Sequence, residues 1–109
     1  MRNDKIEACI EACKVCAEAC NTCSTQNKGQ AEMELSIKLC IACEDACNDL
    51  IAASKTNSDL EALCQKCEAA CNACATECKK HADMIHCEEC ADACEKCAEE
   101  CKSMLELAA

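Results

Sequence analysis

The sequence predicts an all-α protein, an antiparallel up-down-up-down four-helix bundle with a core lined by cysteine. Eighteen of the 109 residues are cysteine, and they fall in four runs with steps of three and four residues. Residues spaced in this way share one face of an α-helix. Three of the runs span 14 residues each, which corresponds to about 21 Å of helix. Stripes of equal length joined by short connections favour four antiparallel helices in a single domain over residues 1–109.

The first two helices are placed by the signals at their ends. The first is expected over residues 3–27, because Gly29, the only glycine, suits a helix C-terminus. The second is expected over residues 31–54, before a polar break at 55–57.

The last two helices follow this break. Ser58-Asp59-Leu60-Glu61 has the pattern of a capping box, in which the Ser58 side chain and the Glu61 side chain satisfy backbone N–H groups of the first turn. The third helix is expected to reach Lys80. A turn near residues 81–83 leads to the fourth helix, which is expected to end near Leu107.

The cysteines form one stripe of thiols on each predicted helix. Cysteine buries less apolar area than leucine or isoleucine, so a core of eighteen thiols is a poor choice for packing alone. Thiolates are ligands for soft metal ions, and we therefore predict that all of the cysteines bind metal. The stripes consist of Cys9, Cys13, Cys16, Cys20 and Cys23; of Cys40, Cys43 and Cys47; of Cys64, Cys67, Cys71, Cys74 and Cys78; and of Cys87, Cys90, Cys94, Cys97 and Cys101.

Charge favours Cu(I) over zinc as the bound metal. A zinc ion held by four thiolates carries two net negative charges, and several such sites would be costly in a buried core. Cu(I) is monovalent and soft, so about one ion per thiolate leaves the interior near neutral. Cys-x-x-x-Cys pairs such as Cys9/Cys13 and Cys16/Cys20 lie one helical turn apart and can each chelate one ion.

Two other functions stay open from the residues alone. One is a zinc or cadmium buffer of metallothionein type, and the other is a redox protein whose thiols form reversible disulfides. A disulfide scaffold is disfavoured, since helical neighbours lie about 5–6 Å apart whereas bridged Cβ atoms lie about 3.8 Å apart. An enzyme is not expected, because no Ser-His-Asp set or phosphate-binding glycine loop is evident.

The second stripe differs from the others at both ends. It continues to Ser36 and Met33 in one direction and to Leu50 in the other. We expect Leu50 to share a hydrocarbon-plugged end of the bundle with Ile6, Leu60, Leu63, Met104 and Leu105. The opposite end is expected to collect Met33, His81, Met84 and His86.

This second end contains further ligand types. His81 continues the third stripe three residues after Cys78. Met33, His81 and His86 are either ordinary helix-end residues or weaker metal ligands that receive Cu(I) at a mouth and pass it to the thiolates.

Net charge excludes some partners. The chain carries a net charge of −10 and no aromatic residue, so nucleic acid is not an expected partner. No apolar run approaches membrane-spanning length, and the N-terminus shows no signal peptide. We therefore expect a cytoplasmic protein with reduced thiols.

The motifs that carry a family resemblance are Cys9-x3-Cys13-x2-Cys16-x3-Cys20-x2-Cys23, Cys40-x2-Cys43-x3-Cys47, and the runs from Cys64 to Cys78 and from Cys87 to Cys101. They cover nearly the whole chain and resemble the bacterial copper storage proteins, in their cytosolic branch. The resemblance implies storage or detoxification of Cu(I), uptake at one end of the bundle through histidine and methionine, and a homotetramer. Cu(I) ions are the expected partner, with a copper chaperone as a candidate donor.

The residues themselves say less about assembly. Leu35, Ile37, Leu39 and Ile41 give the second helix more apolar positions than one inward stripe needs. This surplus is explained either by an interface between subunits or by a wide apolar face within one bundle.

Overall fold

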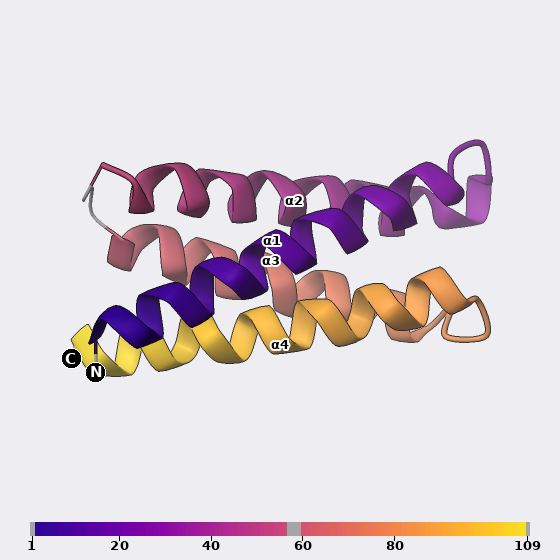
Figure 1. Cartoon of the computed structure of the whole chain (residues 1–109). Helices are drawn as coiled ribbons and strands as arrows, with labels where there is room; N and C mark the ends of the chain where they lie inside the picture. The colour runs from indigo at the N-terminus through magenta and orange to yellow at the C-terminus, as the bar shows by residue number, and fades with distance from the viewer. Residues whose placement is uncertain (1, 57–59, 109) are drawn as a thin grey trace.

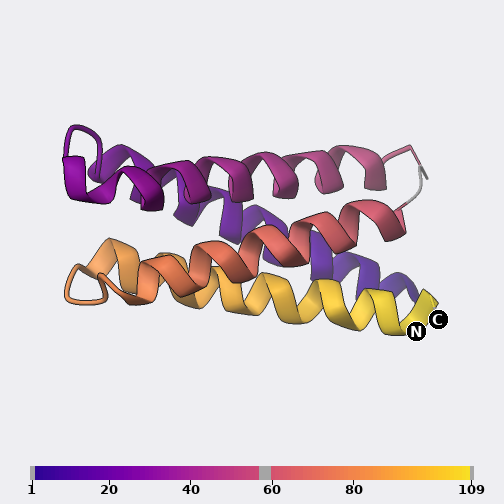
Figure 2. The ribbon, with the colours of Figure 1, turned by 180° about the vertical axis from the view of Figure 1, so that it is seen from behind.

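The computed structural model describes residues 2–56 and 60–108, and these form four α-helices and one 3₁₀ turn. The elements are α1 (Arg2–Gln26), η1 (Ala31–Met33), α2 (Glu34–Ser54), α3 (Leu60–Lys79) and α4 (Ile85–Ala108). Successive helices run in opposite directions, and both chain ends lie at the same end of the bundle (Figure 1; Figure 2, from behind). The predicted fold, an antiparallel four-helix bundle, is confirmed.

The helices pack in a square. Helices α1 and α3 each contact both α2 and α4, whereas no Cα atoms of the described residues in the diagonal pairs α1/α3 and α2/α4 lie within 8 Å of each other. The Cα trace extends 42 × 20 × 17 Å. A square of this kind gives one central channel, toward which each helix presents one face.

The turn between α1 and α2 explains one shift in a boundary. Gly29 has a φ of 88°, a left-handed conformation that glycine adopts at low cost. Residues 31–33 then form η1, so α2 begins at Glu34 rather than at residue 31. The prediction had merged a short 3₁₀ turn with the helix that follows it.

The other ends agree with the sequence within a few residues. α3 ends at Lys79, and the Met84 N–H donates to the His81 carbonyl at 3.0 Å in the turn before α4. The predicted capping box begins at Ser58, which lies outside the described residues.

Candidate metal centre

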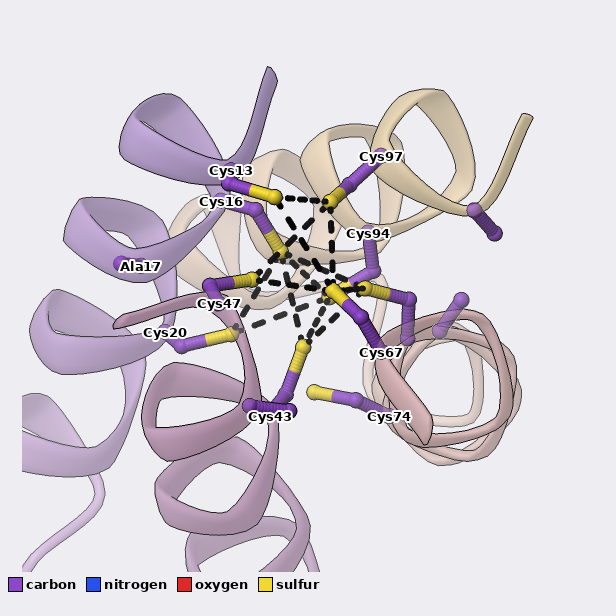
Figure 3. Packing of buried hydrophobic residues seen from close by; sticks show 14 of the residues in the cluster. Cys13, Cys16, Ala17, Cys20, Cys43, Cys47, Cys67, Cys74, Cys94 and Cys97 are labelled. Atoms are coloured by element: carbon purple, nitrogen blue, oxygen red, sulfur yellow. Dashed lines mark hydrogen bonds between the residues drawn. The ribbon is translucent and has the colours of Figure 1, made fainter. Parts of the chain in front are cut away.

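All eighteen cysteine side chains are buried, with 0–1% of their surface exposed. Because each stripe faces the central channel, the thiols of neighbouring helices meet in layers across the bundle. Close contacts between sulfur atoms on different helices define these layers, and Figure 3 shows several of them converging between the helices.

Three layers are complete, with one thiol from each helix. In the central one, Sγ of Cys43 lies 3.4 Å from Sγ of Cys71 and 3.5 Å from Sγ of Cys16. In the full layer that contains Cys13, the four sulfur atoms all lie within 4.8 Å of one another. This spacing suits a shared metal ion. The full layers consist of Cys13, Cys47, Cys67 and Cys97; of Cys16, Cys43, Cys71 and Cys94; and of Cys20, Cys40, Cys74 and Cys90.

The layer at the end near the chain termini has three thiols. Cys9 Sγ lies 3.7 Å from Cys101 Sγ, and Cys64 interacts with both of these thiols. α2 contributes Leu50, which is 1% exposed, at the register position of the missing thiol. The predicted hydrocarbon plug is present, because Ile6, Leu60, Leu63, Met104 and Leu105 pack against the core.

The layer at the opposite end also has three thiols. Cys23 Sγ and Cys87 Sγ are 3.8 Å apart. α2 contributes Ser36, which is fully buried and lies 3.8 Å from Cys78 Sγ. Each end layer therefore lacks a thiol from the same helix, but a leucine replaces it at one end and a serine at the other.

No sulfur atoms are joined covalently. All eighteen cysteines are free, and even the Cys43–Cys71 distance of 3.4 Å is far longer than the roughly 2.05 Å of a disulfide bond.

The core thiols are shifted in opposite directions, because hydrogen bonds from neighbouring thiols lower the pKa of Cys16 and Cys67 and raise that of others. The pKa of Cys13, Cys20 and Cys71 is raised above the ordinary value of 9.0 by hydrogen bonds with surrounding thiols and by burial. Burial also raises the pKa of Cys87, against hydrogen bonds from Asn27 and Cys23 that lower it. These thiols are therefore protonated at neutral pH, and each must release its proton to become a thiolate ligand.

The two histidines lie at the serine end, as predicted. His81 Nε2 lies 3.3 Å from Glu77 Oε2, and His86 Nε2 lies 2.7 Å from Asn27 Oδ1. Both rings are partly buried. Met33, also at this end, is 1% exposed.

Two residues at this end were missed by the sequence analysis. Asn27 is fully buried, and its Nδ2 group donates to Cys23 Sγ at 3.4 Å and to Cys87 Sγ at 3.8 Å. Glu77 is 8% exposed and also pairs with Lys80 at 3.3 Å. Asn27 lies four residues after Cys23, and Glu77 four before His81, so the helical period contains the signal for both.

Comparison with known proteins agrees with this geometry. A sequence model described as copper storage protein matches residues 2–106. The chain belongs to the copper storage protein family. A search of the curated proteins found none that matches this chain.

Solved structures of copper storage proteins share the bundle. The Cu(I)-bound Bacillus protein BsCsp3 is 43% identical, with 93% of this chain and 98% of that chain covered and a TM-score of 0.87. A cytosolic copper storage protein from Streptomyces lividans with five coppers is 31% identical, with coverages of 96% and 95% and a TM-score of 0.91. The S. lividans protein loaded with 10 copper equivalents is 31% identical, with coverages of 94% and 85% and a TM-score of 0.89.

Proposed function

We propose that residues 1–109 form one storage unit that sequesters many Cu(I) ions on the thiolates of its core. The observation that carries this proposal is the convergence of thiols from all four helices, in groups whose sulfur atoms lie within 4.8 Å of one another. Copper-loaded relatives with the same bundle support it.

The layers are connected along the channel. Cys16 Sγ lies 4.0 Å from Cys20 Sγ, and Cys67 Sγ lies 3.9 Å from Cys71 Sγ. Cys16 belongs to at least two of the four-thiol groups. The sulfur atoms therefore form one continuous column, in which an ion that needs only two or three sulfur ligands finds many overlapping positions.

Distance alone does not separate Cu(I) from zinc, because a tetrahedral site with Zn–S bonds of about 2.3 Å has sulfur atoms about 3.8 Å apart. Charge does separate them. Among the residues whose side chains the structure describes, the buried polar or charged ones are Asn27, Ser36 and Glu77, and none is a cation. Nothing in the described core balances the charge of several zinc-thiolate sites, whereas Cu(I) balances one thiolate per ion. This supports storage of Cu(I) over a zinc buffer.

The test is an anaerobic titration of the reduced protein with Cu(I) and, separately, with Zn(II), each in competition with a chelator. We expect tight binding of about one Cu(I) per cysteine. A variant with Cys16, Cys43, Cys71 and Cys94 changed to Ser should lose about four ions of capacity. Saturation at about four Zn(II) that bind more tightly than Cu(I) would support the zinc buffer instead.

The role of Met33, His81 and His86 as a mouth is part of the same proposal. Their position at the end of the column where Ser36 replaces leucine supports it. His81→Ala and Met33→Ala variants should take up Cu(I) more slowly with little change in capacity. Met104→Ala, at the leucine end, is the matched control and should leave the rate unchanged. A collapse of capacity without a change in rate would contradict the role.

Location and assembly complete the proposal: a cytoplasmic homotetramer supplied by a copper chaperone. One relative is described as cytosolic. Among the described residues, no helix combines the length and apolar character needed to cross a membrane. Leu35 and Ile41 are 53% and 47% exposed on α2, whereas Ile37 and Leu39 pack against the core.

The two exposed residues on α2 offer a test of assembly. Light scattering should show a tetramer that Leu35→Glu and Ile41→Glu dissociate and that Val15→Glu on α1 does not. A wild-type monomer would contradict the tetramer.

A further inference from the structure

We propose that Asn27 is a positioning residue that couples His86 to the Cys23/Cys87 thiol pair, so that Cu(I) passes from the imidazole to these two sulfur atoms as they release their thiol protons to solvent. The inference rests on the proposed function and assigns a role to a residue that is not itself a soft-metal ligand.

Asn27 is held in place on both sides. Its backbone N–H donates to the Cys23 carbonyl at 3.0 Å, and its own carbonyl accepts from the Gln30 N–H at 3.1 Å. The side chain is fully buried. It uses its amide nitrogen toward the sulfur atoms of Cys23 and Cys87 and its oxygen toward His86. A buried amide with both ends satisfied has little freedom to reorient.

This contact fixes the tautomer of His86. The amide oxygen of Asn27 can only accept a hydrogen bond, so His86 Nε2, at 2.7 Å, must carry the proton. In the neutral ring the lone pair is then on Nδ1, which is the nitrogen free to bind a metal. Metal-binding histidines are commonly oriented by an oxygen that accepts from the other ring nitrogen.

His86 also faces the outside of the bundle. It lines a surface groove of about 320 Å³ between α1 and α4, whose walls include Glu18 and Glu89. These carboxylates favour a cation in the groove. The order of contacts is therefore groove, His86, Asn27 and then the Cys23/Cys87 pair.

Among the described residues of this end, Ser36 and His81 lack such a connection. Ser36 contacts Cys78 at 3.8 Å but is not the partner of a histidine. His81 contacts the carboxylate of Glu77, which is paired with Lys80. Asn27 is thus the described residue that touches both a histidine and two thiols, which favours this pair as the acceptor.

The experiment compares the initial rate of Cu(I) uptake from a chelator in four reduced proteins. Asn27→Leu removes both sets of contacts at similar size. Asn27→Asp keeps the oxygen that accepts from His86 but loses the donor to the thiols. Ser36→Ala is the matched control, because it removes a buried polar contact to sulfur in the same layer without affecting a histidine.

We expect Asn27→Leu to slow uptake by about tenfold or more, as loss of an orienting partner commonly does, and Asn27→Asp to slow it as well. Ser36→Ala should remain within about twofold of wild type because it leaves the proposed route intact. ¹⁵N NMR of the histidine ring should show the Nε2–H tautomer of His86 in wild type and in Asn27→Asp and its loss in Asn27→Leu. Circular dichroism confirms that each variant is folded.

A double-mutant cycle shows whether Asn27 and His86 act together or independently in uptake. If Asn27 acts through His86, the Asn27→Leu/His86→Ala variant should be no slower than the slower single variant. Additive effects, an unchanged rate in both Asn27 variants, or an equal slowing by Ser36→Ala would each overturn the inference. A wild-type protein that binds no Cu(I) would contradict the proposed function itself, whereas normal filling of Asn27→Leu at the wild-type rate would contradict only this inference.

Discussion

The two ends of the sulfur column have the same number of thiols and opposite character. At one end Leu50 and Met104, which are 1% and 8% exposed, close the core with hydrocarbon. At the other, the buried Ser36 and Asn27 place hydroxyl and amide groups against sulfur. The difference shows that an α2 residue and a residue from another helix together make each end of the column apolar or polar.

The physical consequences differ accordingly. A buried leucine excludes water and stabilises the fold by about 1.5–3 kcal/mol, but offers no ligand or hydrogen bond. The polar groups stabilise the fold less, but they contact thiols that must exchange protons for metal. We therefore expect hydrocarbon packing to stabilise the leucine end more, and the proposed uptake route to lie at the serine end.

Copper loading should produce the largest change in the free energy of unfolding, because bound ions stabilise the whole sulfur column. The leucine plug then contributes a smaller share of the total stability. A ligand at 100 times its Kd adds about 2.7 kcal/mol per site, so four independent sites would add about 11 kcal/mol. The measurement is thermal unfolding of reduced protein with and without Cu(I). An unchanged Tm would contradict a core filled with metal, and a chelator should reverse the gain.

Alkaline pH should remove the part of the metal-free protein's stability that depends on thiols with a raised pKa. The pKa of Cys13, Cys20 and Cys71 is raised above 9.0 in the folded state, so the unfolded chain loses these protons first. Their contribution is fully present below about pH 9 and is lost as pH rises, at up to about 1.4 kcal/mol per thiol for each pH unit.

Urea unfolding under reductant at pH 7 and pH 10 measures this loss. A Cys20→Ala variant should show a smaller difference between the two pH values, while equal stability at both would contradict the prediction. At the polar end, the hydrogen bond from Asn27 opposes the rise in the pKa of Cys87 that burial causes.

The fold and the sulfur column could be predicted from the sequence because both depend on the helical period alone. Steps of three and four fix the face on which each cysteine lies, and antiparallel packing then sets Cys43 against Cys16 and Cys71. The replacement of a thiol by Leu50 or Ser36 followed from the same register. The start of α2 could not be predicted from this register, since a 3₁₀ turn at residues 31–33 has no strong signal in the sequence.

The roles of Asn27 and Glu77 could not be predicted in the same way. Asparagine after a helix commonly ends it in contact with solvent, and a glutamate on a charged surface is commonly exposed. Their contacts with His86 and His81 depend on how α1 and α4 meet and on how the chain turns after α3. Local spacing relates Asn27 to Cys23 and Glu77 to His81, but the contact between Asn27 and His86 is set by tertiary packing.

Removing the plug should affect stability far more than removing the serine. Leu50→Ala leaves a cavity at a fully packed position and should cost about 2–5 kcal/mol in the free energy of unfolding. Ser36→Ala removes one contact to sulfur and should cost about 1 kcal/mol or less. Urea unfolding of the two metal-free variants at neutral pH checks the ratio, and equal losses would contradict the division of roles between the ends.

Adding the missing fourth thiol to an end layer should give the smallest change in copper capacity and stability. It also allows the most direct comparison of the two ends. Ser36→Cys replaces a buried oxygen with sulfur beside Cys78 and adds the missing fourth thiol, so capacity should rise by about one Cu(I) with little change in stability. Leu50→Cys adds a thiol to the other incomplete layer and should bring a similar gain, but with a loss of about 1–3 kcal/mol from the missing hydrocarbon.

Native mass spectrometry of copper-saturated protein counts the ions, and urea unfolding measures the cost. Because the two variants are equal in thiol number, a difference in stability isolates the packing of Leu50, and a difference in capacity isolates the surroundings of the added sulfur. If Ser36→Cys binds no further ion while Leu50→Cys does, the polar groups at Ser36 and Asn27 are not adjacent to metal positions, and the serine end loses its place as the mouth of the column.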